Sequence, residues 1–127
     1  EVLFLTNNRI KTVSDAIINL ENLSYLSLSN NVIERFPPGL LRLFYLKRLV
    51  LDHNNIASVP EEISGLVRLS LVNLNNNQLT KLPRSLKRMT KLESVFVSAN
   101  PFSGVFSRLS TSAPEDNALP VLKNLEY

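Results

Sequence analysis

The stretch LSYLSLSNNVIERFPPGLLRLFY, residues 23–45, is followed directly by LKRLVLDHNNIASVPEEISGLVR, residues 46–68. Both stretches have leucine at their first, fourth and sixth positions, asparagine at the ninth and isoleucine at the eleventh. A match of this kind between adjacent stretches of equal length predicts an internal repeat, and therefore a fold built from stacked copies of one unit.

The same step extends through most of the chain. Asparagine recurs at Asn8, Asn31, Asn54, Asn77 and Asn100, always one unit length after the last. Two apolar columns keep the step as well: Leu3, Leu26, Leu49, Val72 and Val95, and Leu5, Leu28, Leu51, Leu74 and Val97. Within one unit the period is two, so Leu49 and Leu51 point to one side of the chain and Val50 to the other. This alternation predicts one short strand in each unit.

Strands that follow one another at a fixed step are expected to pair in parallel, which requires a return segment and a right-handed connection. Pro37, Pro60 and Pro83 stand in the return segments at a position suited to the first residue of a short helix. Glu61 and Glu62 follow where a helix N-terminus favours negative charge. We therefore expect an α/β fold, a right-handed solenoid bent into an arc. Its parallel sheet would lie on the concave face and its short helical or 3-10 turns on the convex face.

The asparagine column has a structural explanation. Where the chain leaves each strand, its backbone donors and acceptors lose their sheet partners, and a side-chain amide can bond to both kinds of group. Leaving such groups unpaired costs on the order of 1–3 kcal/mol each. We therefore predict that Asn8, Asn31, Asn54, Asn77 and Asn100 form a structural ladder rather than a catalytic site.

The pattern resembles the leucine-rich repeat family, because LxxLxLxxNxL followed by xxLPxxLxxLxx matches from residue 1 to about residue 109. The proline after the back-face leucine resembles the intracellular 23-residue subtype, from which the first unit departs with Ser14 and the fifth with Phe106. The stretch NPFSGVF, residues 100–106, resembles a plant receptor variant instead. The resemblance implies a non-catalytic module that binds a partner protein, such as a small GTPase or another signalling protein, within a cytoplasmic scaffold.

The repeats account for a single segment over residues 1–127, with about five units and the start of a sixth. Leu122 and Leu125 have the three-residue spacing that opens a unit, but they follow Leu109 only after ten additional residues. A polar insertion is therefore predicted at 110–119. The chain begins inside a strand and stops inside a unit, so we expect both ends to continue in a longer chain, whose flanking repeats would cover the bare leucines.

Function is expected on the strand side chains that point away from the core, because the fold does not use them. Their columns bring together apolar groups that folding alone gives no reason to prefer there. Tyr25 and Arg48 are residue types that are enriched in binding hot spots. The predicted partner-binding residues are Phe4, Tyr25, Arg48, Val50, Asp52, His53, Leu71, Asn73, Asn75 and Phe96.

The sequence offers little for catalysis or for cofactor binding. The chain has one histidine, no cysteine and three glycines, so thiolate metal sites are excluded and a phosphate-binding glycine loop is hard to build. Asp52 and His53 are sequence neighbours, and such neighbours rarely form a serine–histidine–acid arrangement. We expect no enzyme activity, no cofactor and no metal. The missing cysteines also favour a reducing compartment, the cytoplasm.

Two other functions stay open. The segment can be the targeting or regulatory repeat domain of a larger enzyme, such as a cyclase, phosphatase, deadenylase or kinase. Alternatively, the basic stretch KLPRSLKRMTK, residues 81–91, places Arg84, Lys87, Arg88 and Lys91 on one side of a convex turn, where they can bind an anionic membrane or RNA. A formal charge of only +3 and the lack of interleaved aromatic residues in this stretch disfavour nucleic acid.

Overall fold

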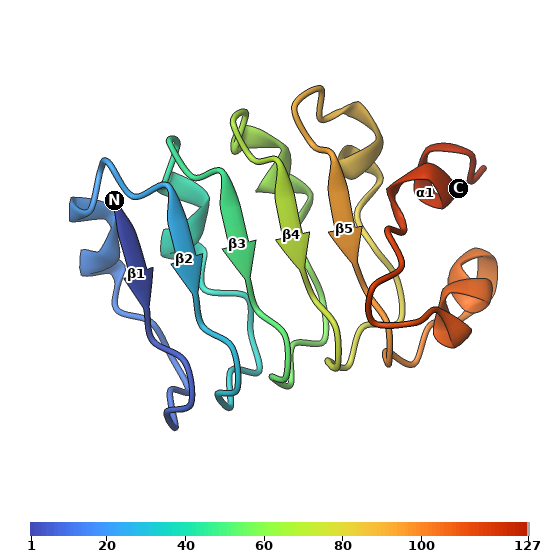
Figure 1. The fold of residues 1–127 in the computed structure, drawn as a ribbon, viewed down its shortest axis with the longest axis horizontal. Coiled ribbons are helices and arrows are strands. Elements are labelled where there is room, and N and C mark those ends of the chain that lie inside the picture. The colour runs from blue at the N-terminus through green and yellow to red at the C-terminus, as the bar shows by residue number, and fades with distance from the viewer. Residues whose placement is uncertain (127) are drawn as a thin grey trace.

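The computed structural model describes residues 1–126, and Tyr127, the last residue of the predicted repeat segment, lies outside the described residues. In the described part the chain forms five short strands that pair in parallel in their sequence order. The strands are β1 (Val2–Phe4), β2 (Tyr25–Ser27), β3 (Arg48–Val50), β4 (Leu71–Asn73) and β5 (Ser94–Phe96). They lie side by side in Figure 1, each one coil further along the molecule. The predicted parallel sheet is thus confirmed.

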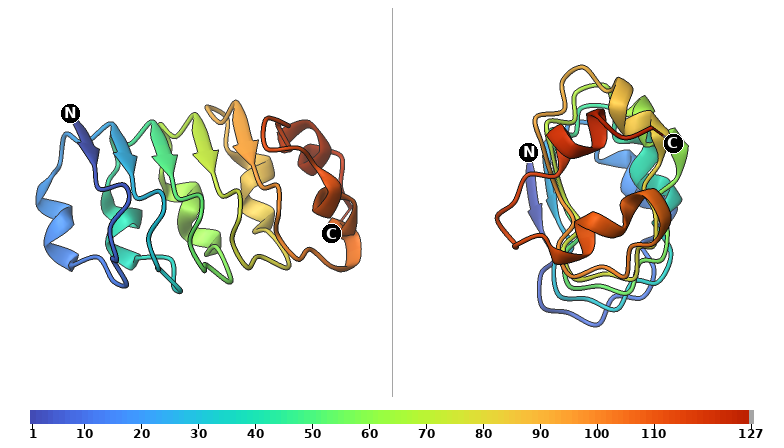
Figure 2. Two further views of the ribbon diagram at one scale, coloured as in Figure 1. Left: turned by 60° about the horizontal axis from the view of Figure 1, so that its bottom comes forward. Right: turned by 90° about the vertical axis from the view of Figure 1, so that its right-hand side faces the viewer.

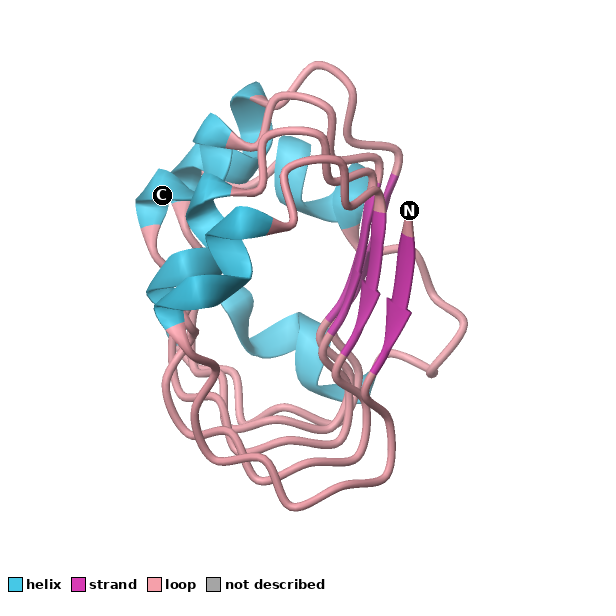
Figure 3. Cartoon of the chain, turned by 90° about the vertical axis from the view of Figure 1, so that its left-hand side faces the viewer, coloured by secondary structure: helices cyan, strands magenta, loops and turns pink. Residues whose placement is uncertain are grey.

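A return segment with a short 3-10 helix follows each strand. These helices are η1 (Asp15–Asn19), η2 (Pro38–Arg42), η3 (Glu61–Gly65), η4 (Arg84–Arg88) and η5 (Gly104–Thr111). Viewed along the coils, the strands line one side of the molecule and the helical turns line the other (Figure 3). Figure 2 shows the coils stacked into an elongated solenoid. This architecture confirms the predicted α/β solenoid, with its parallel sheet on one face and its short turns on the other.

The core lies between the sheet and the helical turns. Neighbouring strands pair at residues that share a repeat position, so Leu26 is beside Leu49 and Leu49 is beside Val72. These three side chains are fully buried. Leu3 and Leu5 of the first coil are only partly buried, because within the described chain they have a neighbouring coil on one side. Each coil therefore buries its apolar side against the next one.

The predicted asparagine ladder is present. The side-chain NH2 of Asn54 donates to the carbonyl of Leu51 in its own coil (3.1 Å) and to that of Leu28 in the preceding coil (2.9 Å). Its oxygen accepts from the backbone N–H of Ile33 in the preceding coil (3.0 Å). Asn8, in the first coil, donates to carbonyls of its own coil. Bonds across two coils, like those of Asn54, are also made by Asn31, Asn77 and Asn100.

The helical turns begin within one residue of the predicted position. Pro37, Pro60 and Pro83 are the cap residues of η2, η3 and η4, one position before the first helical residue, with φ of −66°, −71° and −68°. The proline ring fixes φ near this value and so favours the turn. In the first coil Ser14 takes the same place, and its hydroxyl accepts from the backbone N–H of Ala16 (3.2 Å). Two residue types therefore start the turn at the same point of the coil.

Glu61 links the third and fourth coils. Its carboxylate accepts from the backbone N–H of Ser85 (2.9 Å) and from that of Arg84 (3.0 Å), at the start of η4. Hydrogen bonds to the charged form of a carboxylate favour that form. The bonds from the Ser85 and Arg84 backbone therefore hold the pKa of Glu61 below its ordinary value.

The predicted insertion, residues 110–119, has its end bound to the edge of the sheet. The side-chain oxygen of Asn117 accepts from the backbone N–H of Val95 (2.9 Å), and its NH2 donates to the carbonyl of Glu93 (2.8 Å). The N–H of Ala118, which is buried, donates to the carbonyl of Val95 (2.7 Å). A last strand presents unpaired backbone groups, which need partners of this kind. The insertion therefore closes the outer edge of β5.

The residues after the insertion form a short helix. Leu122 and Leu125 are buried, but instead of opening a sixth repeat unit Leu122 lies in a short helix, α1 (Leu119–Lys123). This helix packs against η4, at the end of the molecule shown in red in Figure 1. Pro120 stands in the first turn of α1, where its missing N–H is not needed, whereas in a paired strand it would remove a hydrogen bond. A helix thus covers the core at this end.

We expect Asn54→Ala to lower the free energy of unfolding by about 2 kcal/mol, because it leaves the buried N–H of Ile33 without a partner and removes one of the two amide bonds to each of the Leu28 and Leu51 carbonyls. Asn8→Ala is the matched control, since Asn8 is exposed and bonds to its own coil, and we expect it to cost less than about 1 kcal/mol. Urea unfolding followed by circular dichroism measures both. Equal losses would contradict the cross-coil role of the ladder.

We expect Glu61 to make stability depend on pH. A pKa that is lower in the folded state than in the unfolded state adds stability above the unfolded pKa, and this contribution is lost as the pH falls through the folded pKa. The free energy of unfolding should therefore fall below about pH 4.5, the ordinary Glu value, and part of this fall should be missing in Glu61→Gln. Glu62→Gln, one residue further in the same turn, is the matched control. Identical pH profiles for the two variants would contradict the assignment.

Candidate functional site

The predicted contact residues share one face of the sheet. Strand pairing brings equivalent positions side by side and forms two outward rows across the coils. The rows are Val2, Tyr25, Arg48, Leu71 and Ser94, and Phe4, Ser27, Val50, Asn73 and Phe96. We call this surface the sheet face. Because neighbouring strands lie about 4.8 Å apart, groups from several coils can contact one partner.

Apolar side chains on the sheet face lie outside the buried core. Phe4 is 65% exposed, and its ring packs on that of Tyr25 with centroids 5.1 Å apart. Val50, Leu71 and Phe96, further along the sheet, are half-buried. These positions lie outside the core, so filling the core does not account for an apolar group there.

Asp52 and His53 form a small polar cluster with Ser29 of the preceding coil. Nδ1 of His53 lies 2.9 Å from Oδ2 of Asp52, and the Ser29 hydroxyl donates to the other carboxylate oxygen. The hydroxyl therefore meets the acid, whereas a serine–histidine–acid arrangement requires it to meet the histidine ring. The cluster fixes the position of an exposed imidazole on the rim of the sheet face, and its geometry is not that of a hydrolase site.

One predicted contact residue, Asn75, is corrected by the structure. Asn75 is only 6% exposed. Its NH2 donates to the carbonyl of Pro114 in the insertion (2.8 Å), and its oxygen accepts from the N–H of Ser98 (2.7 Å). Its neighbour Asn73 stays half-buried on the sheet face and accepts from the Asn75 N–H (3.0 Å). The Asn75 amide thus holds the insertion against the sheet and is not available to a partner.

A feature of the rim was missed by the sequence reasoning. The residue before each ladder asparagine has positive φ, between 53° and 58°. Three of these residues are asparagine, which tolerates this conformation, but the other two are His53 and Ala99. The repeated Asn-Asn pairs in three of the coils were the available signal. His53 thus combines a positive φ with an exposed imidazole on the rim.

The basic stretch 81–91 lies on the outer side of the solenoid, as predicted. Leu86 and Met89 are buried, and the basic side chains around η4 are exposed. The ammonium group of Lys87 donates to the carbonyl of Leu125 (2.6 Å). Part of the charge in this stretch is therefore used inside the molecule, to hold the residues that follow α1.

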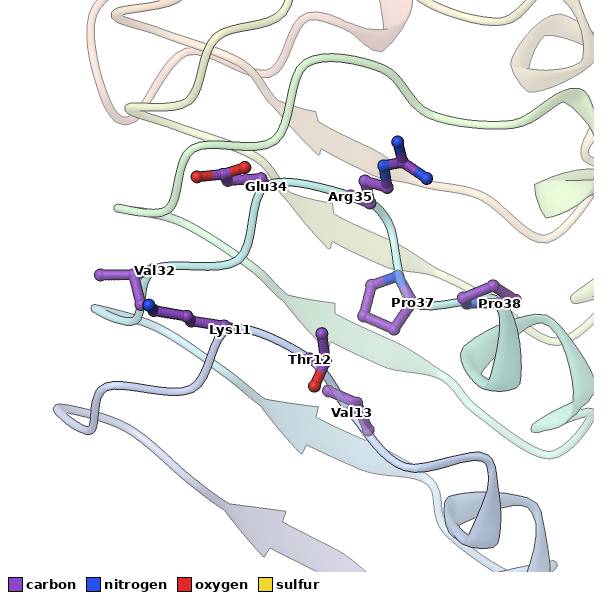
Figure 4. Close-up of a pocket in the computed structure, with 8 residues that line it drawn as sticks. All are labelled: Lys11, Thr12, Val13, Val32, Glu34, Arg35, Pro37 and Pro38. Atoms are coloured by element: carbon purple, nitrogen blue, oxygen red, sulfur yellow. The ribbon is translucent and has the colours of Figure 1, made fainter.

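A hollow of about 530 Å³ lies between the first two coils, away from the sheet face (Figure 4). Its lining includes Lys11, Glu34 and Arg35, together with Pro37 and Pro38. In Figure 4 the side chains of Glu34 and Arg35 point in different directions. Ligand pockets are marked by polar groups that converge on one point, and these side chains do not converge.

Residues 1–126 carry neither a metal cluster nor a membrane-spanning helix. In this range no group of three or more histidine, cysteine, aspartate or glutamate side chains is placed to hold a metal ion. Over the same range no helix has the length and apolar character required to span a bilayer.

Comparison with known proteins gives a consistent picture. The family model for the leucine rich repeat matches residues 1–43 and 44–102. No curated protein matches the chain. Among solved structures, a leucine-rich repeat protein of Leptospira interrogans is 27% identical with a TM-score of 0.70, and the match covers 80% of this chain and 32% of that one. An internalin, InlF, from Listeria monocytogenes is 28% identical with a TM-score of 0.70, over 87% and 32% of the two chains.

A third similar structure was solved with a bound partner. It is the leucine-rich repeat ectodomain of the plant membrane receptor kinase GASSHO1/SCHENGEN3 from Arabidopsis thaliana, in complex with CASPARIAN STRIP INTEGRITY FACTOR 2. It is 32% identical with a TM-score of 0.73, and the match covers 81% of this chain and 13% of that one. This chain thus spans about a third or less of the length of each of these three proteins.

We expect Ala99→Asn to stabilise the protein by about 1 kcal/mol, because alanine at positive φ is strained and asparagine tolerates this conformation. Ala57→Asn is the matched control, since Ala57 is also exposed in a loop but is not among the residues with positive φ. Thermal unfolding of both variants measures the effect. An increase in Tm no larger than that of Ala57→Asn would contradict the strain at Ala99.

Proposed function

The chain belongs to the leucine-rich repeat family, and from this premise we propose that it binds a partner protein along its sheet face and has no catalytic role of its own. Domains of this family commonly serve as interaction modules. The proposal rests on one observation: the sheet face carries apolar side chains that the core does not use. Phe4 and Tyr25 lie at one end of this face, and Val50, Leu71 and Phe96 continue it across the remaining coils.

The residues around these apolar groups suit recognition. Arg48 is exposed beside Tyr25 and Leu71 in one row, and tyrosine and arginine are enriched among the residues that dominate binding energy. Asp52 and His53 supply a fixed polar pair at the rim. An apolar centre with polar groups at its edge is the usual arrangement of a protein interface.

The complex of the similar plant ectodomain supports the proposal, because a related stack of coils holds a partner there. For this chain we propose a signalling protein, such as a small GTPase, as the partner and the cytoplasm as the compartment. The missing cysteines support that compartment. The same sheet face would bind the partner if these repeats are the targeting domain of a larger enzyme. The similar plant protein, a receptor kinase, is an example of an enzyme with leucine-rich repeats. In both cases this chain supplies binding.

We expect Phe4→Asp and Leu71→Asp each to reduce partner capture from cell extract by about 30-fold or more, because each places a charge in the apolar part of the interface. Val105→Asp is the matched control, since Val105 is 48% exposed and lies in η5, outside the sheet face. Captured proteins are quantified by mass spectrometry, and circular dichroism verifies that each variant is folded. Capture that is unchanged by both sheet-face variants would overturn the proposal.

A further inference from the structure

A second exposed apolar surface lies on the edge of the solenoid where the strands begin. Short turns at 20–22, 43–45, 66–68 and 89–91 connect each outer helix to the next strand. We call this row of turns the turn edge; it lies along the upper side of the molecule in Figure 1. It is separate from the sheet face, because its residues precede the strands.

Large apolar side chains are exposed on the turn edge. Phe44 is 50% exposed, Tyr45 47% and Val67 65%, and Leu20 of the first coil is 38% exposed. Ile18, in η1 just before the first turn, is 37% exposed. Ile18, Phe44 and Tyr45 line one hollow of about 310 Å³. The guanidinium group of Arg68 lies 4.3 Å from the centre of the Tyr45 ring, so side chains of neighbouring coils touch on this edge. We call these exposed groups the patch; the hollow joins its first and second coils, and the Arg68–Tyr45 contact joins its second and third.

Folding does not require apolar residues at these positions. The repeat step places Glu21, Phe44, Val67 and Thr90 at equivalent positions. Coils one and four carry a charged and a polar residue there and keep the same turn. Phe44 and Val67 are thus not explained by the coil geometry, and clustered exposure of this kind marks a contact surface.

Basic residues surround the patch. Arg42 lines the same hollow as Phe44, and Arg68 covers Tyr45. Arg88 and Lys91 are exposed one coil beyond Arg68. Glu21 is the acidic group in the lining of the hollow. Apolar and aromatic side chains at the tips of turns, flanked by arginine and lysine, are the combination that binds the interface of an anionic membrane.

We propose that the turn edge docks the protein onto an anionic lipid membrane. The turns of successive coils lie in a row along one side of the molecule (Figure 1), so a flat surface can meet several turns at the same time. Apolar tips would enter the headgroup region while Arg42 and Arg68 meet lipid phosphates. The sheet face would stay open to a protein partner, because it lies on a different side of the coil (Figure 3).

Sedimentation with lipid vesicles tests the proposal. We expect the protein to pellet with vesicles that contain phosphatidylserine, to stay in solution with pure phosphatidylcholine, and to dissociate at high salt. The double variant Phe44→Thr/Val67→Thr should lower the partition coefficient at least about tenfold. Arg42→Gln and Arg68→Gln should each lower the partition coefficient by roughly fivefold, and the double variant should lower it more than either single variant. Threonine is the residue that the fourth coil has at this position, so the first pair is expected to fold.

Val105→Thr is the matched control, since it replaces another exposed valine, 48% exposed, that lies away from the turn edge, in η5. It should pellet like the unchanged protein. Leu71→Asp, on the sheet face, should also pellet normally, which keeps this proposal independent of the proposed function. If the protein stays in solution with phosphatidylserine vesicles at low salt, the proposal is overturned and an acidic protein becomes the partner for this edge. Equal loss in Val105→Thr and in the turn-edge variants would overturn it as well.

Discussion

The structure depends on hydrogen bonds that Asn31, Asn54, Asn77 and Asn100 each make to the coil before them. Asn54 accepts from the buried N–H of Ile33 in the preceding coil, and it donates to the carbonyl of Leu28, which Asn31 also binds. Because such groups are costly to leave unpaired, the spacing from one asparagine to the next is held constant along the ladder. The one insertion, at 110–119, comes after the last of these asparagines and so does not disturb the ladder.

A fixed core leaves the remaining positions of the coil free to vary. Inward positions stay apolar from coil to coil, whereas outward positions change, as in the series from Glu21 to Phe44 and Val67. Two surfaces result: the sheet face, with its row around Val50, and the turn edge, with its patch around Tyr45. Binding can thus diversify on both surfaces without altering the bonds that hold the coils together.

Much of the fold and part of the candidate site follow from periodicity. The strands, the parallel pairing, the ladder and the outward side of Phe4 and Val50 were predictable, because each repeats the same local pattern. Asn75 was not predictable, since the segment that buries it lies 39 residues further along the chain. The fate of Leu122 was also misjudged: its spacing matched a repeat, but Pro120 suits the first turn of a helix better than a paired strand.

The sequence by itself determined the coil: its length, its inward leucines and the asparagines that join it to its neighbour. These are local or strictly periodic, so one unit predicts the next. Only the tertiary structure decided how groups from different coils combine on the surface. Arg68 lies over Tyr45, and Asn117 closes the edge of β5, because stacking brings together side chains that the chain separates. Contacts of this kind depend on which residues happen to occupy equivalent positions, and periodicity does not specify them.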